Sequence, residues 1–196
     1  RWAMSMAGAA MYAPVLTRFY ARLALRTLDA VESEVSQARA MTYLGVATGL
    51  IGIGQLERSE AQAIQAQTLF DQMADMRRWL EACATLAFIA ARQGNFEKAY
   101  AIRQSMQERS QQANITRGEI WSLAEMGQVR MRQGRFEEAL AHFERRKQLI
   151  EQSKKDGENL TSNTYPATVY FRMAQLQQAR ITTRQAAEEI KSVGFT

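Results

Sequence analysis

The stretch Gly94-Asn95-Phe96-Glu97-Lys98-Ala99 returns 40 positions later as Gly134-Arg135-Phe136-Glu137-Glu138-Ala139. In both copies a glycine stands two residues before an aromatic residue, and an alanine follows three residues after that aromatic residue. Glycine tolerates the backbone conformation that ends a helix, and the residues after it are typical of a helix start. A fixed period of this size indicates a repeat array. The sequence therefore predicts units of 40 residues with a turn between two helices in each.

Two columns of residues support this period. Counting in steps of 40 from Gly94 gives a column of turn residues: Pro14, Gly54, Gly94 and Gly134. Seven positions before each of them stands a small residue: Ala7, Ala47, Ala87 and Gly127. Small side chains let two helices cross closely. Because the second column was not used to find the first, it supports antiparallel helix pairs independently.

The composition predicts an all-α chain. Hydrophobic residues make up 46% of it and only two prolines interrupt it, which suits long helices with a continuous core. We expect one array over residues 1–196, with about nine or ten helices and a right-handed superhelical course. The predicted repeats cover residues 1–36, 37–76, 77–116, 117–152 and 165–194.

Within these repeats the predicted helices are 1–12 with 15–32, 37–52 with 56–73, 77–92 with 96–112, and 118–132 with 136–151. A longer connection is expected between pairs than within them. The polar residues 153–164 indicate a loop. Pro166 suits the first turn of a new helix, which we expect to run to about Arg180, with Thr182 capping a short last helix. The fifth pair is thus expected to be displaced from the period.

Two arginines interrupt the apolar stripes of these helices. Arg103 breaks the stripe of helix 96–112, and Arg130 breaks that of helix 118–132. A buried arginine needs either a route to water or an acidic partner. We expect each one either to reach solvent with its head group or to pair with a glutamate.

The charge pattern disfavours nucleic acid as a partner, and the apolar segments do not fit a membrane span or a signal peptide. The net charge of +5 is mildly basic, but the charges are scattered with mixed sign, which disfavours nucleic acid. The apolar stretch 41–54 is too short to span a bilayer, and residues 2–16 lack the basic leader of a signal peptide. We predict no membrane segment, and we expect the chain to be a fragment that begins inside a helix.

The residues with catalytic or metal-binding chemistry are isolated. Cys83 is the only cysteine and lies among apolar residues, which suits a buried side chain and a reducing, cytoplasmic location. His142 is the only histidine, so a histidine metal cluster is excluded. The glycines around Gly54 close a helix instead of following a strand, unlike a phosphate-binding loop. We predict no enzyme, no cofactor and no metal site.

The pattern around the second copy resembles the tetratricopeptide repeat. Its best match comprises Leu123, Gly127, Gly134, Phe136, Ala139 and Phe143. The resemblance covers residues 37–151 well and both ends weakly. The period of 40 residues instead of 34 and the missing proline at the end of the second helix depart from the common pattern. Longer variants of this kind are similar to the sensor regions of signalling ATPases, MalT-type activators and multidomain nucleotide cyclases.

The resemblance implies a protein-binding scaffold. In that family the first helices line a groove that holds a peptide or a partner helix. Carried onto this chain, the groove would include Thr48, Phe88, Arg92, Trp121, Glu125, Gln128, Arg132, Phe171 and Gln175. Aromatic residues there would anchor the partner, and Arg92 with Arg132 would hold a carboxylate. The lysines of the family's chaperone-binding clamp are missing from the first helices, so that ligand class is rejected.

Two other functions stay open from the sequence. A homotypic assembly module would use exposed apolar end helices, particularly residues 2–12. A nucleic-acid-binding helical repeat is favoured only by the net charge. The sequence does not name the partner or the oligomeric state.

Overall fold

The computed structural model describes residues 14–28, 36–155 and 164–192. Within this part the chain forms nine α-helices and no strand, which confirms the predicted all-α class. The predicted helix of residues 1–12 lies outside the described residues. The helices are α2 (Pro14–Thr27), α3 (Gln37–Gly52), α4 (Leu56–Gln72), α5 (Met76–Arg92), α6 (Phe96–Gln112), α7 (Thr116–Arg132), α8 (Phe136–Lys155), α9 (Thr164–Arg172) and α10 (Leu176–Ser192).

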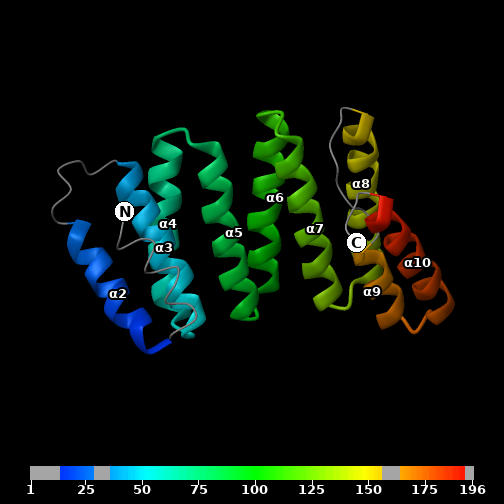
Figure 1. The fold of residues 1–196 in the computed structure, drawn as a ribbon, viewed down its shortest axis with the longest axis horizontal. Coiled ribbons are helices and arrows are strands. Elements are labelled where there is room, and N and C mark those ends of the chain that lie inside the picture. The colour runs from blue at the N-terminus through cyan, green and yellow to red at the C-terminus, as the bar shows by residue number, and fades with distance from the viewer. Residues whose placement is uncertain (1–13, 29–35, 156–163, 193–196) are drawn as a thin grey trace. The chain divides into compact units, whose positions relative to one another are not determined.

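The chain divides into two compact units, residues 1–102 and residues 103–196, with the boundary inside α6. In the first unit α2, α3, α4 and α5 pack successively, and α3 also contacts α5 directly (Figure 1). Its core contains one cluster between α2 and α3 around Val46 and Leu50, and a second cluster around Leu86 and Ile89. α3 and α5, the first helices of two successive pairs, are therefore in contact, as expected for an array of helix pairs.

The second unit repeats this arrangement with α7, α8, α9 and α10. α7 packs on α8, α9 packs on α10, and α9 also contacts both α7 and α8 (Figure 1). One of its core clusters is centred on Phe143 of α8 and Val169 of α9, with Met131 of α7 packed against it. That the five repeats form one continuous array stays a prediction.

From Gly54 to Gly134 the turns recur every 20 residues, twice as often as the glycine column predicts, and a further one follows at Ala174. Six residues adopt a positive φ of 53° to 79° at the ends of helices. In all six turns the N–H of the next residue donates to the carbonyl five positions earlier, at 2.8–3.0 Å, as in a Schellman motif. We expected a longer connection between pairs than within them, and this prediction is wrong for the connections that the structure describes, because the same turn closes both kinds. The six residues are Gly54, Ala74, Gly94, Asn114, Gly134 and Ala174.

The last pair corrects the predicted boundaries. α9 ends at Arg172 instead of near Arg180, and Thr182 lies inside α10, where its hydroxyl donates to the Gln178 carbonyl. Ala174 stands 40 positions after Gly134 and takes the same left-handed conformation, with φ 59°. The fifth pair is thus in register with the others. Ala167, seven positions before Ala174, continues the column of small residues.

The column of small residues marks close helix packing, as predicted. Ala47 and Ala87 are 0% and 2% exposed. A Cβ atom on Gly127 would lie 2.5 Å from Cε1 of Phe143, so α7 approaches α8 more closely there than any side chain allows. The neighbouring helix pairs consequently tolerate little change at these positions.

Candidate partner-binding face

Helices α5 and α7, the first helices of two pairs, bury most of their residues and expose one narrow stripe each. In α7 the stripe contains positions spaced four, four, three and four residues apart, which keeps their side chains on one face. Its members are Arg117, Trp121, Glu125, Gln128 and Arg132, and the last four were predicted groove residues. The same spacing in α5 gives Arg77, Glu81, Thr85, Phe88 and Arg92.

An ordered polar cluster surrounds Trp121 in the second unit. The Trp121 side chain is 40% exposed, and the Arg103 guanidinium from α6 lies 5.2 Å from the centre of its ring. Arg103 Nη2 also lies 3.3 Å from Oε2 of Glu125, and Gln128 Nε2 donates to the other oxygen of that carboxylate at 3.1 Å. Three of the four predicted α7 residues therefore belong to one network, which holds an exposed aromatic ring in place.

Arg103 is the site residue that the sequence prediction did not include. Only 4% of it is exposed, so its charge needs a partner, and Glu125 supplies one. Arg130 is 7% exposed and forms the analogous ion pair with Glu138, 3.3 Å from its Nε. Pairing with glutamate, one of the two alternatives for these arginines, is confirmed. The only signal of Arg103 in the sequence is its interruption of an apolar stripe, which indicates a buried charge but not its partner.

The first unit brings Phe88 and Arg92 together. Phe88 is 42% exposed, and the Arg92 guanidinium lies 5.8 Å from the centre of its ring, one helical turn further along α5. Thr48 of α3 is half-buried and donates its hydroxyl hydrogen to the Leu44 carbonyl at 3.0 Å. It therefore offers a partner only its oxygen. Arg92 and Arg132 belong to different units, and their joint carboxylate site stays a prediction.

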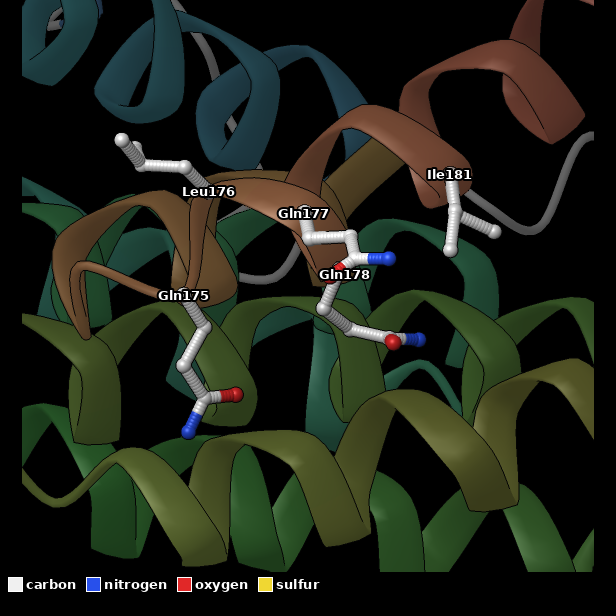
Figure 2. Close-up of a pocket in the computed structure, with 5 residues that line it drawn as sticks. All are labelled: Gln175, Leu176, Gln177, Gln178 and Ile181. Carbon is white, nitrogen blue, oxygen red and sulfur yellow. The ribbon is translucent and has the colours of Figure 1, made fainter.

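The remaining predicted residues lie on the last helix pair. Phe171 of α9 is 66% exposed, and Gln175 borders an open hollow together with Leu176, Gln177, Gln178 and Ile181 (Figure 2). The side chains of Gln175 and Gln178 extend to the same side of the ribbon, and Leu176 extends away from them. With the corrected register, Phe171 corresponds to Met131. The α9 positions that continue the α7 stripe are Tyr165, Thr168 and Arg172.

The described residues contain no group of three His, Cys, Asp or Glu side chains that could hold a metal ion. Cys83 is buried and accepts a hydrogen bond from Gln67 Nε2 at 2.9 Å. Burial and the nearby positive charge of Arg130 lower the pKa of His142 below its usual value, and Glu138 acts in the opposite direction. No helix in the described ranges is both long and apolar enough to cross a membrane.

Comparison with known proteins defines the fold. No family model matches the chain, and no curated protein matches it. Among solved structures, apo RapI is 16% identical, with a TM-score of 0.79 over 98% of this chain and 70% of RapI. TPR-like repeats of a putative kinesin light chain from Podosopora anserina are 14% identical, with a TM-score of 0.78 over 100% of this chain and 96% of that chain.

A third similar structure is a Rap protein complexed with competence and sporulation factor. It is 18% identical, with a TM-score of 0.71 over 95% of this chain, and this chain spans only 51% of its length. Identities at this level support a shared fold only. The nine described helices and these similarities confirm the resemblance that the sequence showed. The chain therefore has the fold of a tetratricopeptide-like helical array.

Proposed function

We propose that this chain is a protein- or peptide-binding scaffold whose partner lies along the exposed stripes of the first helices in each unit. The observation that carries the proposal is the state of Trp121, which is 40% exposed although its ring is stacked on the buried Arg103. An aromatic side chain that is ordered before binding loses little entropy when a partner covers it. Aromatic residues of this kind dominate binding energies.

The wider role is part of the same proposal. The chain acts without catalysis of its own, as the sensor or assembly segment of a larger signalling protein in the cytoplasm. The Rap protein complexed with competence and sporulation factor supports the binding of a factor by this fold. The residues that we assign to the binding stripes are Phe88 and Arg92 in the first unit, and Trp121, Glu125 and Gln128 in the second.

The test selects ligands from a displayed library of random dodecapeptides and measures their binding to the wild type and to Trp121→Ala by fluorescence anisotropy. Truncating a central aromatic anchor should weaken binding about 30-fold. Ile64→Ala is the matched control, because Ile64 is also an exposed apolar side chain, at 44%, but lies on the second helix α4. Selected peptides that bind Trp121→Ala as tightly as the wild type would exclude this face.

A second candidate function is homotypic assembly. One side of α2 exposes three apolar side chains at helical spacing, Leu16, Phe19 and Leu23, which are 46%, 60% and 42% exposed. The residues 2–12 that the sequence prediction assigned to self-association lie outside the described part. Sedimentation velocity over a hundredfold concentration range tests this function, and a monomer throughout would remove it.

A further inference from the structure

The period of 40 residues places an arginine at the last position of three first helices. Arg92 ends α5, Arg132 ends α7 and Arg172 ends α9, and all three are exposed. The last two belong to the same unit. Because the sequence prediction displaced the fifth pair, it did not align Arg172 with Arg132. The corrected register places these two arginines at equivalent positions of helices that contact each other.

The core beneath these arginines holds the two helix ends together. Met131 of α7 and Met173, which follows α9, both pack against the cluster that contains Phe143 and Val169. Each arginine is the direct neighbour of one of these methionines in the chain. The backbones of Arg132 and Arg172 are therefore fixed at the edge of one packed cluster, while their side chains are exposed.

Neither guanidinium is engaged within the part of the chain that the structure describes: no hydrogen bond, ion pair or ring contact involves the side chain of Arg132 or Arg172 there. Other arginines of this protein do have acidic partners, such as Arg78 with Asp75 and Arg135 with Glu138. A cation at a helix C-terminus interacts favourably with the helix dipole. That interaction leaves the donors of the guanidinium available to a ligand.

The acidic residues of α7 and α9 do not compensate these charges. α9 contains no Asp or Glu. In α7, Glu119 is buried and accepts a hydrogen bond from Gln111 at 2.8 Å, and Glu125 pairs with Arg103. The exposed stripe of these two helices is therefore basic and suits a partner of negative charge.

We infer that Arg132 and Arg172 bind two side-chain carboxylates of one extended acidic segment of a partner protein. The inference rests on the proposed function, because the segment would continue along the stripe that contains Trp121. The axes of packed helices lie about 8–10 Å apart, and an extended chain advances about 3.3 Å per residue. Side chains two positions apart lie on the same face of an extended chain, about 6.6 Å from each other, so two acidic residues spaced in this way would reach the two arginines together. Each guanidinium can bind a carboxylate through two parallel hydrogen bonds.

The test uses three synthetic peptides on the intact chain. The first has blocked ends and carries glutamates at every second position, alternating with serine and leucine. The second has glutamine in place of each glutamate, and the third is the glutamine peptide with a free C-terminal carboxylate. Fluorescence anisotropy at low and high salt gives the affinities. We expect the glutamate peptide to bind about tenfold more tightly than either glutamine peptide, and salt to reduce this difference.

Variants locate the interaction. Arg132→Gln and Arg172→Gln should each weaken binding of the glutamate peptide about three- to fivefold, the effect of one exposed charge pair. The matched control is Arg145→Gln, which removes the same charge from an exposed position of α8 and should change binding less than twofold. Circular dichroism of each variant verifies that the helices are retained.

The outcomes separate this inference from the proposed function. Equal binding of the glutamate and blocked glutamine peptides would overturn the inference, as would an equal loss in Arg132→Gln and Arg145→Gln. Preference for the free C-terminal carboxylate would also contradict it. If library-selected peptides depend on Trp121 while the glutamate peptide shows no preference, only the inference fails. If the glutamate peptide depends on both arginines while Trp121→Ala binds every peptide normally, the inference holds and the role of Trp121 as the anchor of the proposed function fails.

Discussion

Replacing Gly127 by alanine tests the close helix packing on which the fold depends. A Cβ atom at this position would lie 2.5, 2.6 and 2.9 Å from three ring carbons of Phe143. Ordinary contacts between carbon atoms are about 3.5–4.0 Å long. The ring cannot easily withdraw, because Phe143 is only 1% exposed and is stacked on Tyr165 with 5.2 Å between ring centres. The added methyl group must therefore separate α7 from α8.

Two opposing effects determine the magnitude. Alanine is favoured over glycine inside a helix by about 1 kcal/mol. Overpacking a rigid core costs about 1–3 kcal/mol, and contacts this short on an enclosed ring place Gly127→Ala at the upper end of that range. We therefore expect the free energy of unfolding to fall by about 2 kcal/mol, and the melting temperature to fall by about 4–8 °C for a chain of this length.

Urea denaturation followed by circular dichroism measures this change. Gly45→Ala is the matched control, because it is the same substitution inside a helix but its new Cβ atom would meet nothing within 4 Å. It should gain up to about 1 kcal/mol. Phe143→Leu combined with Gly127→Ala should cost less than the sum of the two single changes, since a smaller side chain relieves the overlap. A Gly127→Ala protein as stable as the wild type would refute the packing argument.

Two further predictions concern the turns and the response to pH. Ala174→Gly should raise the free energy of unfolding by about 0.5–1 kcal/mol in urea denaturation, because alanine is strained at the φ of 59° that glycine adopts freely, whereas an unchanged or lower stability would contradict the strain. The pKa of His142 is lowered in the folded state, mainly by burial, so the unfolded chain binds more protons and stability should fall as the pH drops below the unfolded pKa of about 6.5. His142→Gln should make the denaturation midpoint less sensitive to pH between pH 7.5 and 5.5, and an unchanged pH dependence would exclude His142 as its source.

The column of glycines predicted three of the six turns. The other three have no glycine, which explains why the sequence did not reveal them. Gly54, Gly94 and Gly134 stand out in the sequence because glycine is the usual residue in the left-handed conformation. Ala74 and Ala174 adopt the same conformation, although alanine is not favoured there. Their turns are closed by hydrogen bonds between backbone groups, which do not depend on the residue type and therefore cannot be recognised in the sequence. The register of the last pair could not be deduced from glycine alone.

The exposed stripe of α7 could be predicted because it follows the helical period, but its supporting residue could not. Trp121, Glu125 and Gln128 belong to one helix, so their spacing places them on one face. Arg103 belongs to the preceding helix, and its ion pair with Glu125 joins residues 22 positions apart. Its position interrupts an apolar stripe, which signals a buried charge without identifying the partner. Pairing with glutamate was one alternative, and only the contacts of Arg103 with α7 select it.

The burial of Arg103 is better explained by the surface it supports than by stability. Replacing a buried ion pair with apolar side chains of similar volume is often neutral or stabilising, so burial alone does not call for a guanidinium at position 103. Arg103 nevertheless contacts the ring of Trp121 and the carboxylate of Glu125 at once. It thereby restricts two side chains that a partner would meet, which lowers the entropy lost on binding. Under the proposed function, Arg103 is therefore the residue that prepares the α7 stripe for binding.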